Sequence, residues 1–236
     1  MKVSSRAAVC RAAAEIERLL IVSTVVAIDG PAGAGKSTVA KLLAERMGYA
    51  YVNTGSLYRA LAYAALRSGV APGALTAEFL QQQHLQFHGA DLYLNGVKLD
   101  AELRTQECAS NASIIAKQNI VRDYLLPVQR KAAENGWIVM EGRDIGTVVF
   151  PDAKCKFFVT ATAEERARRR MLQHNEVPEG ADFERILAEI KERDARDSQR
   201  EIAPLKQADD ATLVDTTGLT ISEVVDNIVG QLRAGC

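Results

Sequence analysis

"VVAIDGPAGAGKSTVAKLL", residues 25–43, contains three local patterns that together indicate one type of fold. The mostly apolar run over residues 22–28 is rich in β-branched side chains, which is typical of a strand buried on both faces of a parallel sheet. A glycine-rich turn follows at once, and beyond it apolar residues recur at helical spacing up to Gly48. The stretch therefore predicts a strand, a loop and a helix, the first unit of an α/β domain.

The glycine-rich turn fits the pattern G-x-x-x-x-G-K-[ST] at Gly30, Gly35, Lys36 and Ser37. Small residues let successive backbone N–H groups turn inward as an anion-binding nest, and the following helix points its positive end at this nest. Lys36 is expected to reach the β- and γ-phosphates of a nucleotide, and the Ser37 hydroxyl to bind Mg²⁺. The predicted phosphate-binding residues are Gly30, Pro31, Ala32, Gly33, Ala34, Gly35, Lys36, Ser37 and Thr38.

Strand-like and helix-like patterns alternate along the rest of the chain. Short apolar runs predict further strands at residues 49–53, 137–141, 154–160 and 212–218. Apolar residues at helical spacing predict helices at residues 54–69, 106–134, 163–173, 182–200 and 220–233. Strands that alternate with helices imply a parallel sheet flanked by helices on both faces, so the expected fold class is α/β.

Two segments depart from this alternation. Around residues 75–99 apolar and polar residues alternate about Asn95-Gly96, a strong hairpin signal, so we expect a small antiparallel β insert. Residues 1–20 are rich in alanine and arginine. We interpret them as a helical extension outside the core rather than as a targeting peptide, because the apolar run that follows leads directly into the glycine loop.

The composition excludes several classes of partner. The chain has 236 residues, 47% of them hydrophobic and 25% charged, with a net charge of −1, as in an ordinary globular protein. A net charge this close to zero gives no basic surface that would attract a nucleic acid. No apolar stretch reaches the ~20 residues that span a bilayer. We therefore expect neither a nucleic acid nor a membrane as a partner. No long exposed apolar stripe is evident, which favours a monomer.

The four cysteines, Cys10, Cys108, Cys155 and Cys236, are scattered and form no C-x-x-C pair. This spacing favours free thiols in a reducing cytoplasm over a disulfide framework or a zinc site. Cytoplasmic localisation is therefore the expectation from sequence.

Basic residues recur at positions where one helix or turn could present them together. Arg59 follows Tyr58 near the start of the helix expected at 54–69, and Arg143 follows the strand at 137–141. Two further sets lie on single helix faces, Arg166 with Arg170 at i, i+4 and Arg193 with Asp197 and Arg200 at i, i+4, i+7. Guanidinium groups offer a planar fork that matches phosphate.

This set of arginines suits phosphoryl transfer to a nucleoside monophosphate. The attacking phosphate oxygen is already anionic, so the reaction needs positioning and charge neutralisation rather than a general base. The alternative is that "RARRR" (166–170) and "KERDARDSQR" (191–200) are solvated helix faces with i, i+4 ion pairs. With a phosphate-binding loop upstream, we favour a lid that closes over the triphosphate and excludes water.

The stretch "WIVMEGRDIGTVVFP", residues 137–151, ends an apolar strand at Glu141 and sets Arg143 and Asp144 between two glycines. A structural interpretation is a turn with a solvated ion pair. A functional interpretation is a site that holds an anionic group and a hydrogen-bond donor at once.

The chain resembles the bacterial cytidylate kinase family from residue 22 onward. The similar stretches, in order, are "AIDGPAGAGKST", "NTGSLYRALAYAAL", "LRTQECASNAS", "VRDYLLPVQR", "EGRDIGTVVFPDAKCKFFVTATAEERARRR" and "IKERDARDSQREIAPL". The most specific element is the block G-R-D-x-G-T-V-V-F-P. The resemblance implies a P-loop nucleoside monophosphate kinase fold with an enlarged insert and a helical lid. It also implies transfer of the γ-phosphate of ATP, with Mg²⁺, to CMP and dCMP.

On this resemblance, residues 21–236 form a single kinase domain after the extension at 1–20. Its core covers about 21–70, 106–165 and 201–236, its monophosphate-binding insert about 71–105, and its lid about 166–200.

The resemblance also implies a role for each matched residue. Thr54, Tyr58, Arg59 and Arg143 would hold the acceptor phosphate, and Ser113, Arg122 and Asp144 would recognise cytosine. Asp197 would accept a sugar hydroxyl, and Arg193 and Arg200 would reach the transferred phosphoryl group together with Lys36 and Arg143. Arg166 and Arg170 would contact ATP, and Glu141 would reach Mg²⁺, through water where its reach requires one. Cytosine is suited to this set, since its amino group faces an acceptor and its N3 and O2 face donors.

Three alternatives remain open on the sequence. The nearest is a related kinase whose acceptor is UMP or AMP. Adenylate kinases also carry T-G-x-x-x-R, like "TGSLYR" here, but have a G-x-P-R turn in place of "GRDIG" and lack the hairpin insert. A GTPase switch is disfavoured, since "DTTG" (215–218) follows the last strand and no N-K-x-D exists. A binding module without catalysis would leave a dense arginine set without anionic ligands.

Overall fold

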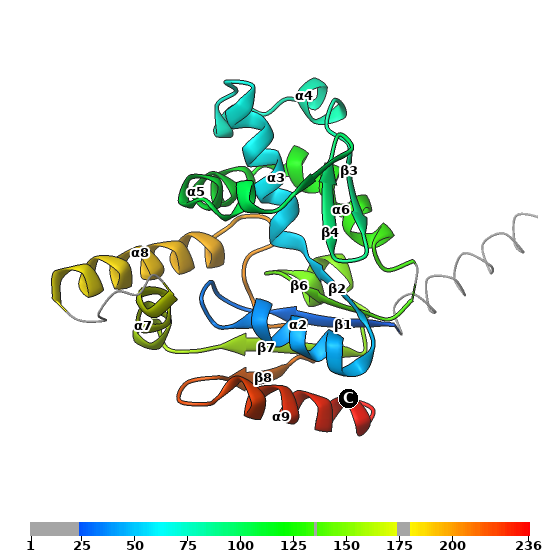
Figure 1. Cartoon of the computed structure of the whole chain (residues 1–236), viewed down its shortest axis with the longest axis vertical. Helices are drawn as coiled ribbons and strands as arrows, with labels where there is room; N and C mark the ends of the chain where they lie inside the picture. Colours follow the sequence, from blue (N-terminus) through cyan, green and yellow to red (C-terminus); the bar gives the residue numbers. More distant parts are fainter. Residues whose placement is uncertain (1–23, 135, 174–179) are drawn as a thin grey trace, which may run out of the picture.

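The centre of the molecule is a five-stranded parallel sheet. The computed structural model describes residues 24–134, 136–173 and 180–236, and the extension expected at residues 1–20 lies outside them. The strands follow the order β2 (Ala50–Asn53), β6 (Ile138–Glu141), β1 (Val25–Asp29), β7 (Cys155–Thr160) and β8 (Thr212–Asp215) (Figure 1). Every adjacent pair is parallel. The predicted α/β class is confirmed.

Strand β1 is apolar from Val25 to Ile28 because each of its faces contacts a different core. Val26 and Ile28 pack with α2 (Lys36–Met47) and α9 (Ile221–Arg233) on one side of the sheet. Val25 and Ala27 pack on the other side, against η3 (Ile145–Val149), a single π-helical turn. A strand with no solvated face favours apolar residues on both sides, which explains why the sequence pattern does not alternate before Asp29 at its end.

A second group of elements lies above the β2 edge of the sheet in Figure 1. Its helices are α3 (Thr54–Arg67), α4 (Ala77–Gln81), α5 (Gln106–Ile115) and α6 (Asn119–Lys131), with the short turns η1 (Pro72–Ala74) and η2 (Ala101–Arg104). Their apolar faces form one core with the insert sheet β3 (Leu85–His88), β4 (Asp91–Leu94) and β5 (Val97–Leu99). This continuous core attaches the insert firmly to α3 and α5.

The predicted hairpin in the insert is confirmed. Strands β4 and β5 pair antiparallel, with Leu94 opposite Val97. Asn95 and Gly96 between them have φ of 51° and 80°, which are the positive values that a two-residue turn requires of both central residues.

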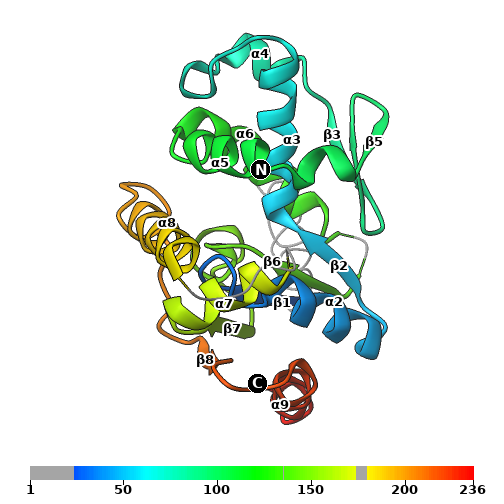
Figure 2. The same cartoon turned by 60° about the vertical axis from the view of Figure 1, so that its left-hand side comes forward.

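Helices α7 (Ala163–Gln173) and α8 (Gly180–Ser198) pack against each other beside the sheet (Figure 2). Their shared core is small and consists of Ala167, Met171, Ile186, Leu187 and Ile190. The remaining faces of both helices are charged, so arginines from this pair are available to the space between α8 and the sheet. Within the residues that the structure describes, no helix has the length and apolar character needed to cross a bilayer.

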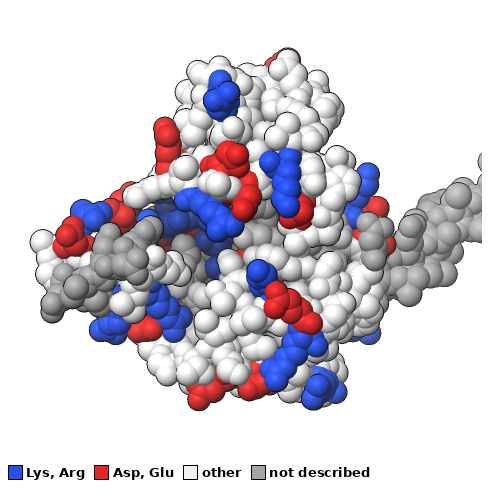
Figure 3. Space-filling view, in the orientation of Figure 1, with Lys and Arg blue, Asp and Glu red and all other residues white. Residues whose placement is uncertain are grey.

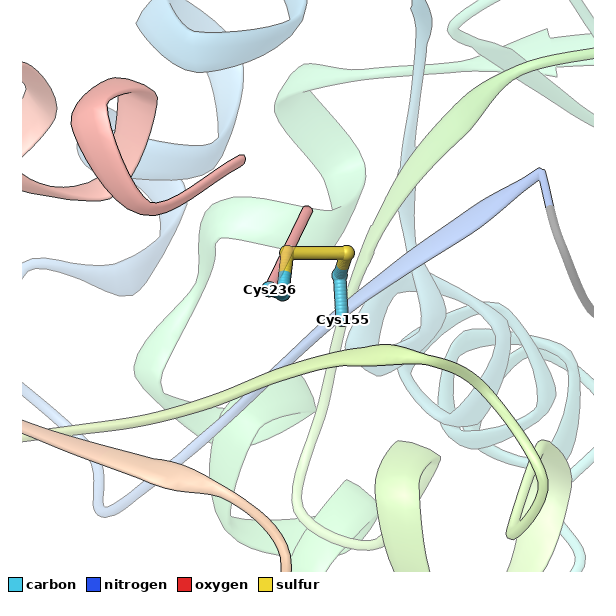
Figure 4. The surroundings of a disulfide bond; sticks show 2 residues. All are labelled: Cys155 and Cys236. Atoms are coloured by element: carbon cyan, nitrogen blue, oxygen red, sulfur yellow. A yellow bond between two sulfur atoms is a disulfide. The ribbon is translucent and has the colours of Figure 1, made fainter. Parts of the chain in front are cut away.

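One expectation from sequence is wrong: two of the cysteines are joined. Cys155 at the start of β7 forms a disulfide with Cys236 at the end of the chain, with their Cα atoms 5.4 Å apart (Figure 4). The bond closes a sequence separation of 81 residues and ties the segment after α9 to the sheet. Only Cys108 is a free cysteine among the described residues, and it is buried.

We expect Cys236→Ser to lower the free energy of unfolding by about 2–4 kcal/mol, because a long closed loop restricts the unfolded chain. For a chain of this length the loss corresponds to roughly 5–15 °C in Tm. Thermal unfolding with and without a reductant measures it. Reductant should lower the Tm of the wild type and leave that of the variant unchanged. An unchanged wild-type Tm after complete reduction would contradict this prediction.

Candidate active site

A cavity of about 870 Å³ opens between the sheet, the α3–α5 group and the α7–α8 pair. It lies where β1, β2 and β6 end, at Asp29, Asn53 and Glu141, which is the edge at which open parallel sheets bind ligands. Lys and Arg side chains gather in the hollow in this part of the surface (Figure 3). The cavity is therefore the candidate site for an anionic ligand.

The glycine loop forms one wall of the cavity. Gly30 has φ of 145°, and a Cβ at this position would lie 1.9 Å from the carbonyl oxygen of Val159, so no other residue fits there. Residues 32–38 line the cavity, whereas the predicted phosphate-binding residues Gly30 and Pro31 do not. The Lys36 ammonium donates to the carbonyl oxygen of Pro31 at 2.6 Å. Burial lowers the pKa of Lys36, and the charge of the nearby Arg143 lowers it further. An anion bound beside Lys36 would therefore stabilise its charged form.

Arg166 supports the loop from α7. Its guanidinium donates to the carbonyl oxygens of Ala161 at 3.0 Å and Ala32 at 3.1 Å, and to the Asp194 carboxylate at 2.6 Å. The side chain is buried and lines the cavity. Arg166 therefore holds the glycine loop in place. Arg170, the other arginine predicted on this helix face, is half-buried, and its guanidinium lies 4.0 Å from the Glu189 carboxylate, so it is held less tightly than Arg166.

Oxygen donors suited to Mg²⁺ meet beside the loop. Glu141 is buried at the end of β6 and accepts a hydrogen bond from the Tyr51 hydroxyl at 2.6 Å. Ser37, at the start of α2, lines the same cavity, and its hydroxyl lies near that of Tyr51. The described residues contain no cluster of three or more His, Cys, Asp or Glu that could hold a metal ion. A serine hydroxyl and one carboxylate fit Mg²⁺ that takes its other ligands from phosphates and water.

The far end of the cavity contains a buried ion pair. The Arg122 guanidinium donates to the Asp144 carboxylate and to the carbonyl oxygen of Ala116 at 3.3 Å. Burial raises the pKa of Asp144, and the Arg122 charge offsets part of this rise. Ser113 beside them is 5% exposed, and its hydroxyl has no hydrogen-bond partner among the described residues. A buried polar group without a partner is costly, which indicates that a ligand completes this end.

Tyr58 adjoins this pair from α3. The Arg122 guanidinium carbon lies 5.9 Å from the centre of the Tyr58 ring. Burial raises the pKa of Tyr58 to about 12, so its hydroxyl stays protonated and can donate. Thr54 at the start of the same helix donates to the carbonyl oxygen of Glu141 at 2.8 Å.

Between the two ends, three arginines surround one carboxylate. Asp197 is 1% exposed and accepts from the Nε of Arg143 at 3.2 Å and from Arg200. Burial alone would raise the pKa of Asp197, but the guanidinium groups of Arg143, Arg200 and Arg193 hold it below its ordinary value. Burial lowers the pKa of Arg193 to about 10, and the nearby Arg143 adds to this effect.

The arginines around Asp197 carry more positive charge than the neighbouring carboxylates neutralise. Arg59 has no ion-pair partner among the described residues, and burial and the Arg143 charge lower its pKa. The Nε atoms of Arg193 and Arg200 are buried without a hydrogen-bond partner in the described part of the chain. These arginines therefore repel one another, and a bound anionic ligand would reduce this repulsion.

The two glycines around Arg143 and Asp144 have a steric reason. A Cβ on Gly142 would lie 2.7 Å from the Thr54 hydroxyl, and one on Gly146 would lie 3.1 Å from Cδ of Lys156. Arg143 and Asp144 do not pair with each other, since each contacts a different partner, Asp197 and Arg122. The interpretation as a solvated ion pair on a turn is therefore wrong.

The structure brings nearly all the predicted site residues to one cavity. Those that line it are Ala32, Gly33, Ala34, Gly35, Lys36, Ser37, Thr38, Thr54, Tyr58, Arg59, Ser113, Arg122, Glu141, Arg143, Asp144, Arg166, Arg170, Arg193, Asp197 and Arg200. Sequence reasoning missed Arg169, which donates to the hydroxyl and the carbonyl oxygen of Thr216 and also lines the cavity. It also missed Tyr51, whose place beside Glu141 has no local signal in the sequence.

Comparison with known proteins gives consistent matches. The family model described as Cytidylate kinase matches residues 26–234. A cytidylate kinase of Shouchella clausii is 47% identical over 214 residues, which cover 88% of this chain and 95% of that protein. A cytidylate kinase of Thermosipho melanesiensis is 45% identical over 211 residues, covering 89% of this chain and 97% of that one. A crystal structure of an uncharacterized protein from Eubacterium ventriosum has a TM-score of 0.50 at 17% identity, covers 90% of this chain and 99% of its own, and supports the fold alone.

Proposed function

The chain belongs to the cytidylate kinase family, and from this premise we propose how its cavity transfers the γ-phosphate of ATP to CMP. The activity is that of an ATP-dependent nucleoside monophosphate kinase. The residue roles that follow are our proposal. The observation that supports them best is a single cavity with a glycine loop at one end, a buried Arg122–Asp144 pair at the other, and partly unpaired arginines between them.

The glycine loop would hold the phosphates of ATP. Residues 32–38 line this end, where their backbone N–H groups would donate to phosphate oxygens, and Lys36 would exchange its bond to Pro31 for one to a phosphate oxygen. Ser37 and Glu141 would hold Mg²⁺, which, when bound, neutralises charge on the β- and γ-phosphates. Arg170 and the newly identified Arg169 would close over the triphosphate from α7.

The arginines between the two ends would serve the transferred phosphoryl group. Arg59 and Arg143 would hold the acceptor phosphate, with Thr54 and Tyr58 as hydroxyl donors. Arg193 and Arg200 have free Nε donors that would neutralise the charge that spreads over the phosphoryl oxygens. No general base is required, because the attacking oxygen of CMP is anionic.

The buried Arg122–Asp144 pair would recognise the base. Asp144 can accept from the cytosine amino group, and Arg122 can donate to N3 and O2, while Ser113 completes the set. Uracil would place a carbonyl oxygen against the Asp144 carboxylate and leave both without a donor. Such a mismatch costs about 1–3 kcal/mol. Asp197 would accept a sugar hydroxyl beside Arg143 and Arg200.

Several finer points belong to the same proposal. We propose dCMP as a second acceptor, since the base and phosphate contacts do not involve the 2′-hydroxyl. We also propose that the protein acts as a monomer. The disulfide contradicts the free thiols from which the sequence predicted a cytoplasmic protein. We still propose the cytoplasm, because its substrates, ATP and nucleoside monophosphates, are found there. We divide the chain into a core, an insert at about 71–105 and a lid at about 166–200.

A coupled assay of ADP release with CMP, dCMP, UMP and AMP as acceptors tests the proposal. We expect CMP and dCMP to be used with the highest kcat/KM, UMP to be at least about tenfold poorer, and AMP to be poorer still. A higher kcat/KM for AMP or UMP than for CMP would remove the cytosine assignment and favour the related kinases considered above.

Arg59→Ala is expected to raise KM for CMP by about 10–100-fold, because it removes a charged hydrogen bond to the acceptor phosphate. KM for ATP should stay within about twofold, since Arg59 lies at the CMP end of the cavity. Steady-state kinetics with each substrate varied in turn measures both. Arg67→Ala, which removes an exposed arginine from the same helix, is the matched control. Equal losses for the two substrates would contradict this role.

A further inference from the structure

A buried acid lies between the glycine loop and the turn that carries Arg143 and Asp144. Asp29 is the last residue of β1, directly before Gly30, and is 5% exposed. It has no salt-bridge partner among the described residues within bonding distance, although the Lys36 ammonium is near enough to influence it. A carboxylate buried without such a partner is costly, so its position has to be explained by its other contacts.

Those contacts are two backbone N–H groups. One carboxylate oxygen of Asp29 accepts from the N–H of Ile145 at 2.8 Å, and the other accepts from the N–H of Gly146 at 2.7 Å. These two residues follow Asp144 directly and begin the π-helical turn η3. The first N–H groups of a helical turn have no partner within the turn, and Asp144 itself forms no side-chain cap. Asp29 therefore caps this turn from another strand.

The cap also fixes the backbone of Asp144. On one side, Asp29 holds the two N–H groups that follow this residue. On the other side, the carbonyl oxygen of Asp144 accepts from the N–H groups of Val148 and Val149 at 2.9 and 3.1 Å. A Cβ on Gly146 would lie 3.5 Å from an Asp29 oxygen, which is an ordinary contact, and 3.1 Å from Cδ of Lys156, which is a tight one. With its backbone held on both sides, Asp144 places its carboxylate against Arg122.

We propose that Asp29 is a positioning residue for cytosine recognition: it holds the turn that aims the Asp144 carboxylate at the base. This inference rests on the proposed role of Asp144. Burial raises the pKa of Asp29 to about 6, and Asp144 adds to the rise, whereas the two N–H groups and Lys36 oppose it. At pH 8 the group is therefore ionised, and both of its oxygens can accept.

Asp29→Asn tests the proposal with almost no change in size. The amide keeps one acceptor but sets an NH₂ group against one of the two N–H groups, so the turn must shift. We expect KM for CMP to rise about tenfold or more, the CMP:UMP ratio of kcat/KM to fall at least about fivefold, and KM for ATP to change less than about threefold. The ratio separates positioning from a merely structural role, because partial misfolding would reduce activity on both acceptors equally.

Asp210→Asn is the matched control. Asp210 accepts from Lys156 at 2.7 Å near the same turn, but its side chain is largely exposed and holds no backbone group of the turn. Its CMP:UMP ratio should equal that of the wild type. A wild type that fails to prefer CMP would overturn the function proposed above. A wild type that prefers CMP, with an Asp29→Asn ratio unchanged or with equal losses for ATP and CMP, would overturn this inference alone.

Amide hydrogen exchange on the wild type gives a second measurement that does not depend on the folding of a variant. The N–H groups of Ile145 and Gly146 should exchange at least about a hundredfold more slowly than unprotected amides, with no nucleotide bound. Rapid exchange at both positions would show that Asp29 does not hold them and would overturn the proposal.

Discussion

Replacing Asp144 with asparagine is expected to lower kcat/KM for CMP by about 10²–10³-fold, because the change leaves the buried Arg122 charge without its partner and exchanges the charged acceptor of the cytosine amino group for a neutral amide. Activity on UMP should fall far less, since the new amide can donate to the uracil carbonyl. The CMP:UMP ratio of kcat/KM should therefore move toward UMP by at least about tenfold.

The measurement is the ADP-release assay with both acceptors, made at the same ATP concentration. Asp123→Asn, next to Arg122 but exposed to solvent, is the matched control and should leave both activities unchanged. If Asp144→Asn preserves the CMP:UMP ratio, another group reads the base, and the pair with Arg122 is structural only.

Lys36→Met is expected to reduce kcat by about 10³-fold. The ammonium is buried in the glycine loop, and methionine keeps much of the side chain's volume while removing the charge that would stabilise the transferred phosphoryl group. KM for CMP should change by no more than about threefold, because Lys36 lies at the other end of the cavity from the Arg122–Asp144 pair.

The control is Lys41→Met, which removes an exposed lysine one turn further along α2. Its kcat should match that of the wild type. A kcat for Lys36→Met within tenfold of the wild type would mean that the loop binds phosphate without assisting the transfer.

Much of the fold could be predicted from sequence because its signals are local. The glycine loop between a strand and a helix, the alternation of strands and helices, and the Asn95-Gly96 turn each lie within a few residues. The spacing of Arg193 and Asp197 on α8 is also local, but the expected stripe does not extend to Arg200, because α8 ends at Ser198 and Arg200 follows it. The structure nevertheless brings Arg193 and Arg200 to the cavity.

The arginines of α7 lie on two different sides of the helix. Arg168 is exposed and pairs with Glu165 at 3.2 Å, as expected for a solvated helix face. Arg166, Arg169 and Arg170, on the other side of the helix, line the cavity. The pattern of charges alone does not tell which face contacts the glycine loop, because this depends on how α7 packs against α8.

Contacts between distant residues could not be predicted from local patterns. The disulfide between Cys155 and Cys236 depends on where the end of α9 lies relative to the start of β7. The capping of residues 145–146 by Asp29 spans more than a hundred residues. Arg143 and Asp144 are adjacent in sequence, yet their side chains reach different partners on α8 and α6. Only the family resemblance linked Ser113, Arg122 and Asp144 before the structure did.

A crystal structure with CMP bound is the most direct test of the central claim. We predict that the cytosine amino group lies within about 3.2 Å of the Asp144 carboxylate and that the phosphate contacts Arg59 and Arg143. A base bound away from residue 144, with the Arg122–Asp144 pair unchanged and without contact to the ligand, would contradict the account.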